Sequence, residues 1–239
     1  MNNIHEIYEK LVNESSDINE HLPVLYNYAN ECKTITEMGV RGVVSTFAFI
    51  LAKPKIFRGI DLFHPNTWNC GDRLQLIKNY CSENNIQFEF IIGNTLQMQI
   101  EETDLLFIDT LHAYKQLNQE LTLHGNKAKK YIILHDTSSY EYSDERNSYT
   151  NENMDSPIRG LWPAVEEFLK KNNLKIYGGT ALDKFMPEND KISPNKQGKI
   201  VDYDVYSPAP RKNAVELANE LFQAGFTFVS VRAGVTPGV

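Results

Sequence analysis

Acidic side chains interrupt the apolar segments in the first half of this chain, near the point where each segment ends. They are Glu37 in TITEMG, Asp61 in KIFRGID, Asp109 in TDLLFID and Asp136, after His135, in KYIILHD. A buried carboxylate is costly without a polar partner, so each of these acids is expected to meet a polar group or a ligand. Carboxylates accept hydrogen bonds from hydroxyls and bind divalent ions, and a histidine beside them can take up a proton near neutral pH. These side chains therefore predict a polar ligand site.

Short apolar runs alternate with amphipathic stretches, which predicts strands that alternate with helices. The expected strands are 34–39, 55–61, 86–92, 103–109 and 130–136, and the helices between and after them are 45–52, 72–84, 113–128 and 159–173. Two helical segments precede the first strand, the second interrupted near Pro23. Such βαβ units build a parallel sheet covered on both faces. The predicted fold class is α/β, with a Rossmann-like, doubly wound parallel sheet.

The composition limits the classes of protein that the chain can belong to. It has 239 residues, a net charge of −7 and three cysteines without a CxxC pair. The acidic balance argues weakly against a nucleic-acid surface over the whole chain, and the odd cysteine count predicts free thiols in a reducing compartment. The polar N-terminus does not resemble a secretory signal, and no apolar run approaches a membrane span. A cytoplasmic protein without a membrane partner is expected.

The expected ligand site lies beyond the carboxyl ends of the strands, near the point where the strand order reverses. Gly39 and Gly42 would let a ligand approach the backbone after the first strand. Asp61 ends the second strand, where an acid typically accepts from both hydroxyls of a ribose. The segment GVRG is not GxGxxG, which counts against a nicotinamide dinucleotide. A cofactor that has a ribose and a cation but no phosphate suits these acids better.

Three segments together resemble class I S-adenosylmethionine-dependent methyltransferases. They are ITEMGVRGVVSTFAFILAKPKIFRGIDLFHP, DLLFIDTLHAYKQLNQELTLHGNKAKKYIILHDTSSY and GLWPAVEEFLKK, and the resemblance covers about residues 30–172. The group includes cephalosporin-hydroxylase-like and sugar or macrolide O-methyltransferases. It implies methyl transfer from S-adenosylmethionine to a hydroxyl of a saccharide or a glycosylated small molecule. An alternative is a module that binds the cofactor without catalysis.

The same resemblance implies roles for individual residues. Glu37 and Gly39 would line the methionine end of the cofactor, Asp61 the ribose, and Asn94 and Thr95 the adenine. The full set of implied cofactor-binding residues is Glu37, Gly39, Gly42, Asp61, Asn94, Thr95 and Asp109.

A divalent ion, Mg²⁺, is also implied, with Asp109 and Asp136 as ligands. His135 suits this ion less well, because Mg²⁺ prefers oxygen. The sequence departs from many relatives at Leu111, where they carry another acid. His112 would act beside Asp109 as the general base, although either histidine could instead have only a structural role.

Beyond residue 174 the methyltransferase pattern ends, so domains are predicted at 1–173 and 174–239. IYGGTALDKFMP, DYDVYSP and VSVRAGVTPG resemble the start of the nucleotidyltransferase domain in poly(A) polymerase catalytic subunits of large DNA viruses. The resemblance implies a partial α+β segment. The turn Gly178, Gly179 and Thr180 would hold a triphosphate through backbone N–H groups. Asp202 and Asp204 alternate along a strand, so both could hold metal ions on one face.

That fold needs a third carboxylate on a later strand, and none follows in this sequence, so the tail is expected to be catalytically silent. Nucleic acid would be a partner only if the tail belongs to a complete polymerase. The alternative is that DYDVYSP and FTFVSVRAG are edge strands of the first sheet. The polar segment 138–157, with Tyr140, Tyr142 and Tyr149, is expected to be a long loop or lid.

Overall fold

The computed structural model describes residues 4–145 and 157–172. Contacts within the chain separate it into two units, Met1–Leu174 and Lys175–Val239, and the described residues belong to the first. The elements predicted after residue 174 lie outside the described residues. The assignment of the predicted domains 1–173 and 174–239 to two enzyme families therefore stays a prediction.

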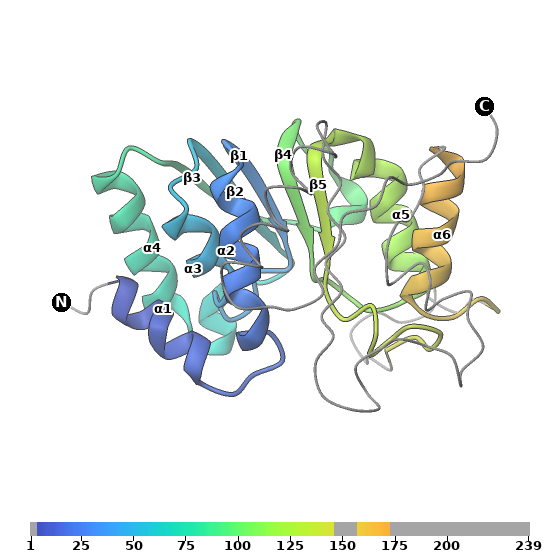
Figure 1. Ribbon diagram of the computed structural model, residues 1–239, viewed down its shortest axis with the longest axis horizontal. Coiled ribbons are helices and arrows are strands. Elements are labelled where there is room, and N and C mark those ends of the chain that lie inside the picture. The colour runs from blue at the N-terminus through green and yellow to red at the C-terminus, as the bar shows by residue number, and fades with distance from the viewer. Residues whose placement is uncertain (1–3, 146–156, 173–239) are drawn as a thin grey trace, which may run out of the picture. The chain divides into compact units, whose positions relative to one another are not determined.

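Five parallel strands form one sheet in the first unit (Figure 1). They are β1 (Thr34–Met38), β2 (Ile56–Asp61), β3 (Gln87–Ile92), β4 (Thr103–Ile108) and β5 (Ala128–Leu134). All five predicted strands are confirmed, with ends that differ by at most a few residues. The order across the sheet is β3-β2-β1-β4-β5, so the winding direction reverses between β1 and β4. This is the doubly wound, Rossmann-like order, and it puts the expected ligand site at the ends of β1 and β4.

Helices cover both faces of the sheet (Figure 1). One face carries α1 (Ile4–Asn13), α2 (Leu22–Asn30), α3 (Ser45–Leu51) and α4 (Gly71–Glu83), and the other carries α5 (Tyr114–His124) and α6 (Leu161–Lys171). Single 3-10 turns lie at η1 (Asn19–His21), η2 (Pro65–Trp68), η3 (Thr95–Gln97) and η4 (Gly125–Lys127). Within residues 4–145 and 157–172, none of these helices has the length and apolar character needed to cross a bilayer.

The expected interruption near Pro23 is wrong. Pro23 lies in the first turn of α2, after η1. A proline is well tolerated there, because the first turn of a helix has no internal partner for its N–H groups and the fixed φ suits the helix. The residue therefore helps to begin α2.

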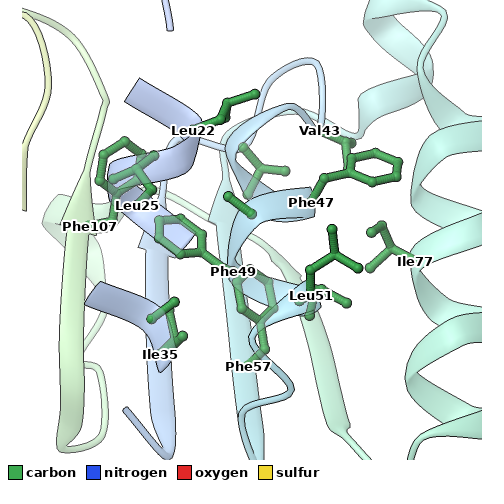
Figure 2. Close-up of a cluster of buried hydrophobic side chains, with 14 of the residues drawn as sticks. Leu22, Leu25, Ile35, Val43, Phe47, Phe49, Leu51, Phe57, Ile77 and Phe107 are labelled. Atoms are coloured by element: carbon green, nitrogen blue, oxygen red, sulfur yellow. The ribbon is translucent and has the colours of Figure 1, made fainter. Parts of the chain in front are cut away.

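The larger core lies under α1 to α4, and aromatic rings form its centre (Figure 2). The ring of Phe49 on α3 lies 5.3 Å from Phe107 on β4 and 6.3 Å from Phe57 on β2. All seven residues of α3 are buried, as expected for a helix that is apolar on every side. The position of α3, and of the β1–α3 loop that leads into it, is therefore fixed by packing.

The second core lies between the sheet and α5 with α6. Residues along β4 alternate between the two cores: Leu105 and Phe107 face the first, and Leu106 and Ile108 face the second. This alternation explains why β4 reads as a continuous apolar run, since a parallel strand covered on both faces has no solvent side. The polar residues of this run consequently lie at its two ends, with Thr103 and Asp104 at the start and Asp109 after the strand.

Candidate active site

The pairing of the central strands continues one residue beyond their ends. The extra backbone hydrogen bonds are Gly39 N to Ile60 O (2.9 Å), Asp109 N to Met38 O (2.9 Å) and His135 N to Ile108 O (3.1 Å). Three predicted site residues, Gly39, Asp109 and His135, are therefore held side by side by the sheet itself. Their positions follow from strand register rather than from flexible loops.

Gly39 allows the ends of β1 and β4 to approach closely. Its φ is +87°, and a Cβ atom there would lie 1.9 Å from the carbonyl oxygen of Asp109. Gly42 has a negative φ and only ordinary van der Waals neighbours, so the fold does not require glycine there. The structure thus explains Gly39 by backbone contact alone. Contact of Gly39 and Gly42 with a cofactor stays a prediction.

Glu37 is completely buried behind this edge of the sheet. Its carboxyl group accepts hydrogen bonds from the hydroxyls of Ser45 and Thr46 (2.6 Å for Thr46) at the start of α3. Burial raises the pKa of Glu37 to about 8, although the two hydroxyls oppose the shift. The polar partners that were expected for Glu37 from the sequence are therefore Ser45 and Thr46. Contact of Glu37 with the cofactor stays a prediction.

Asp61 organises the loop that follows β1. One carboxylate oxygen accepts from the backbone N–H groups of Val40 (2.9 Å) and Arg41 (2.7 Å), and the other accepts from Phe63 (2.9 Å). Arg41 and Val43 both have positive φ, so the loop adopts a backbone that costs energy without such support. A carboxylate has about four lone-pair sites, which leaves room for a further donor such as a ribose hydroxyl.

Asn94 and Thr95, the residues predicted near the adenine, make internal contacts. The Asn94 side chain accepts from Leu96 N (2.9 Å) and begins η3. Thr95 is buried, and its hydroxyl donates to Glu120 on α5 (2.6 Å). Thr110 donates to the same buried carboxylate (2.8 Å), so this network joins the ends of β3 and β4 to α5. The sequence did not single out Glu120, which occurs in an ordinary helical pattern.

Exposed apolar side chains gather beside Asp61. Three of the six large apolar side chains exposed in the described part of the chain are Leu62, Phe63 and Ile92, with exposed fractions of 50%, 41% and 59%. They follow β2 and end β3, and Gly93 N donates to Asp61 O (2.8 Å) between them. This apolar surface was not anticipated from the sequence, because each residue alone resembles part of a strand.

Asp109, His112, His135 and Asp136 form a polar cluster at the ends of β4 and β5. One ligand atom from each lies within 4.8 Å of all the others. The cluster unites the residues predicted for catalysis and for metal binding. Burial alone would raise the pKa of Asp109, but His112 and His135 outweigh it and lower this pKa to about 2. Asp109 in turn raises the pKa of both histidines against the opposing effect of burial.

The ring of His112 is held on two sides by the segment after β5. Its Nδ1 lies 2.9 Å from the carboxylate of Glu145, and its ring stacks parallel to Tyr140 with centroids 4.8 Å apart. The Glu145 N–H also donates to the carbonyl oxygen of His112 (2.7 Å). Nε2 of His112 therefore faces the cluster. Sequence reasoning missed Glu145, since it occurs in a polar stretch without periodicity.

Asp144 joins this segment to the two helices beyond it. Its side chain is buried and accepts from the backbone N–H groups of Tyr114 (2.8 Å) and Gly160 (2.7 Å), and it pairs with Arg159 (3.0 Å). These bonds fix the start of α5, which follows His112, and the start of α6. In the predicted loop 138–157, Tyr142 is exposed and Tyr149 lies outside the described residues.

The tail residues Gly178, Gly179, Thr180, Asp202 and Asp204 lie outside the described residues as well. Residues 163–238 match a protein-family model described as poly(A) polymerase catalytic subunit. The match begins inside α6, the last helix of the first unit.

Curated relatives of this chain carry the same description as the family model. A proposed poly(A) polymerase catalytic subunit of Acanthamoeba polyphaga mimivirus is 27% identical over 115 residues, covering 43% of this chain and 20% of the relative. Its African swine fever virus (Tick/Malawi) counterpart is 37% identical over 78 residues, 32% of this chain and 16% of the relative. The chain thus spans about a fifth or less of the length of these curated relatives.

Solved structures similar to this chain include methyltransferases. Magnesium protoporphyrin IX methyltransferase from Synechocystis is 11% identical with a TM-score of 0.46, covering 72% of this chain and 81% of that one. The N-terminal domain of EvdMO1, solved with SAH and D-fucose, is 13% identical with a TM-score of 0.43, covering 66% and 73%. Such distant likenesses carry no argument about activity, and the fold assignment rests on the strand order.

Proposed function

We propose that the first unit transfers a methyl group from S-adenosylmethionine to a hydroxyl of a saccharide or a glycosylated small molecule. The observation that carries the proposal is the meeting of Gly39, Asp61 and Asp109 where the winding of the sheet reverses. The methyltransferase-like motifs in the sequence support it independently. The three free cysteines suit a reducing, cytoplasm-type compartment.

The proposed cofactor site has a polar and an apolar part. Asp61 would accept from the ribose hydroxyls, and the exposed side chains of Leu62, Phe63 and Ile92 would cover the adenine. The negative potential of Asp61 and Asp109 favours a cofactor that carries a positive sulfonium. A phosphate-bearing dinucleotide would be repelled by the same carboxylates.

The proposed chemistry uses the cluster beside Asp109. Bound S-adenosylmethionine would supply an electrophilic methyl group: attack by the acceptor oxygen would break the carbon–sulfur bond and release the sulfur as a neutral thioether. The hydroxyl proton passes to Nε2 of His112, whose ring is oriented by Glu145 and whose protonated form is stabilised by Asp109. Proton transfer of this kind typically contributes about 10²–10⁴ in rate.

A matched pair of variants tests the cofactor site. Asp104 accepts backbone N–H groups of Lys33 (2.7 Å) and Thr34 (3.2 Å) at the opposite edge of the sheet, so it shares the structural role of Asp61 without its position. Calorimetric titration with S-adenosylhomocysteine should show that Asp61→Asn weakens binding by about tenfold or more. Asp104→Asn should bind like the wild type. Equal affinities for all three proteins would remove Asp61 from the site.

The alternative, that the first unit binds the cofactor without catalysis, is tested with the same protein preparation. Turnover of labelled S-adenosylmethionine with a panel of saccharide acceptors is expected, and binding of S-adenosylhomocysteine without any turnover would favour the module.

A second candidate function belongs to the tail. The family match over residues 163–238 favours nucleotidyl transfer of the poly(A) polymerase type, with nucleic acid as a partner, if the segment acts within a complete polymerase. We propose that the tail alone is inactive, because only Asp202 and Asp204 are present where metal clamping needs a third carboxylate.

A further inference from the structure

The polar cluster brings two imidazole nitrogens and two carboxylate oxygens together, and each nitrogen lies within 3.5 Å of both oxygens. The separations are 3.1 Å (His112 Nε2 to Asp109 Oδ1), 3.5 Å (His112 Nε2 to Asp136 Oδ2), 3.4 Å (His135 Nδ1 to Asp109 Oδ1) and 3.4 Å (His135 Nδ1 to Asp136 Oδ2). Tetrahedral bonds of about 2.0–2.2 Å place neighbouring ligand atoms about 3.3–3.6 Å apart. Octahedral Mg²⁺, with bonds of about 2.0–2.1 Å, needs about 2.8–3.0 Å. Three of the four separations fall in the tetrahedral range.

His135 indicates a ligand site rather than a set of ion pairs. The residue is 7% exposed, and neither ring nitrogen makes a hydrogen bond to any described residue. Nδ1 lies beside both Asp109 and Asp136 but lacks the geometry for a hydrogen bond to either. The ring packs edge-on against His21 at 5.4 Å, which keeps it in place. A buried imidazole without a hydrogen bond to either ring nitrogen is costly, and a metal ion between the four side chains would satisfy Nδ1.

The backbone and the outer contacts also suit a metal site. Asp136 has a φ of +55°, a left-handed conformation that an aspartate tolerates at some cost and that lets it follow His135 at the strand end. Glu145 binds the outer nitrogen of His112, as a carboxylate commonly does for a metal-bound histidine. The bond fixes which nitrogen of His112 faces the centre.

We propose that Asp109, His112, His135 and Asp136 bind a nitrogen-preferring divalent transition-metal ion, such as Zn²⁺, in place of the Mg²⁺ that the sequence resemblance implies. Imidazole nitrogen suits zinc, cobalt and iron ions, whereas Mg²⁺ binds oxygen. The inference deepens the proposed function, because the ion would occupy the site of methyl transfer. With the ion bound, His112 is a ligand and is no longer the proton acceptor.

The test uses the full chain, stripped of metal by a chelator and titrated with Co²⁺ as an optical probe. We expect one tightly bound ion with the intense visible bands of four- or five-coordinate cobalt, displaced by equimolar Zn²⁺ and not by millimolar Mg²⁺. X-ray absorption of the Zn²⁺ form should show two imidazole ligands. Weak bands of six-coordinate cobalt, displacement by Mg²⁺, or the absence of a tight ion would each overturn the proposal.

Variants localise the ion. His112→Gln and His135→Gln should each weaken Co²⁺ binding by more than the roughly 10–100-fold typical for loss of an outer contact. His64→Asn changes a histidine that receives a hydrogen bond from Asn66 N and packs against Phe90, and it should bind Co²⁺ like the wild type. Circular dichroism checks that each variant is folded. If His135→Gln is unfolded, Asp136→Asn and the imidazole count in the wild type still decide the question.

Titration with S-adenosylhomocysteine separates this inference from the proposed function. If the protein binds Co²⁺ as expected but does not bind S-adenosylhomocysteine, the methyl-transfer proposal is contradicted and the metal inference stands. Cofactor binding and turnover that require Mg²⁺ and fail with Zn²⁺ or Co²⁺ would contradict the metal inference and support the methyl-transfer proposal.

Discussion

Two acids near the same edge of the sheet, Glu37 and Asp109, have pKa values that are shifted in opposite directions. Glu37 meets two hydroxyl groups, and burial raises its pKa to about 8. Asp109 meets two imidazoles, and its pKa is lowered to about 2. Near neutral pH the first is therefore largely protonated and neutral, and the second is charged. Glu37 is fully buried beside neutral hydroxyls, whereas the Asp109 side chain is 23% exposed and lies beside two imidazoles, so burial and neighbours together decide which acid carries a charge.

The difference assigns different work to the two regions. A neutral Glu37 fastens β1 to the start of α3 and behaves as part of the core. A charged Asp109 keeps an electrostatic field in the cluster and stabilises positive charge on His112, His135 or a metal ion. The same change from carboxyl to amide should consequently have very different effects at the two positions.

The largest effect is expected for Asp109→Asn. Removing the charge takes away the carboxylate that stabilises positive charge on His112 or on a bound metal ion, so methyl transfer should fall by about a hundredfold or more. The matched change Glu37→Gln replaces a neutral carboxylic acid by an amide of the same shape and should leave turnover within about a factor of two of the wild type near pH 7. Turnover measured with labelled cofactor checks both. Equal losses in the two variants would break the comparison.

A smaller loss is expected for Glu145→Gln. This change keeps the shape that orients His112 and removes only the charge beside Nδ1, so turnover should fall by about tenfold. Glu167→Gln is the control, since Glu167 accepts from Tyr114 Oη (2.9 Å) and Asn118 Nδ2 (2.8 Å) away from the cluster. If Glu145→Gln matches this control, the contact between Glu145 and His112 has no role in turnover.

Glu37 should also make stability depend on pH. Its folded pKa of about 8 exceeds the ordinary value of 4.5, so its stabilising contribution is complete below pH 4.5 and is lost as pH rises to about 8. Asp109 does not change stability over this range, because its lowered pKa makes the free energy of unfolding depend on pH only below its ordinary value of 3.8. The difference in free energy of unfolding between Glu37→Gln and wild type should grow in favour of the variant between pH 5 and pH 8. Denaturant titrations followed by tryptophan fluorescence measure it, since both tryptophans, Trp68 and Trp162, lie in the first unit. A constant difference across this range would show that Glu37 stays charged.

The smallest expected effect concerns the tail, for which we expect no reaction at all. Purified protein with labelled ATP, Mn²⁺ and an RNA primer should give no extension, because two acids do not align a triphosphate for in-line attack and misalignment costs orders of magnitude in rate. Primer extension that Asp202→Ala abolishes would make nucleotidyl transfer the principal function.

The fold could be predicted from the sequence because the strands of a covered parallel sheet are recognisable as short, largely apolar runs. The runs that contain Phe57 and Phe107 are largely apolar, and apart from Arg58 within β2 their charged residues, such as Asp61 and Asp109, lie at the strand ends. Since strand ends meet at one edge of a parallel sheet, the grouping of the strand-end acids followed without any knowledge of the loops.

The contacts of individual residues were beyond the sequence. Thr95 was expected at a ligand and instead donates to Glu120, because only the packing of α5 decides which way the residue faces. Glu145 reaches His112 from 33 positions away, through a segment that has no periodicity to predict its path. Side-chain partners of this kind depend on the three-dimensional path of the connecting segments, and local sequence patterns do not predict that path.

The bonds of Asp144 and its neighbours bear on how the protein can change over evolution. Asp144 accepts from Gly160 N, and Leu161 N donates to Tyr140 O (2.9 Å), so residues 140–144 are held against the start of α6. Lengthening a loop whose ends are already held costs only about 0.6 kcal/mol per doubling. An insertion between residues 145 and 157 should therefore cost little stability, while His112 and the start of α5 keep their places. Changes to the chain that keep the Asp144 bonds are thereby separated from changes that would displace His112.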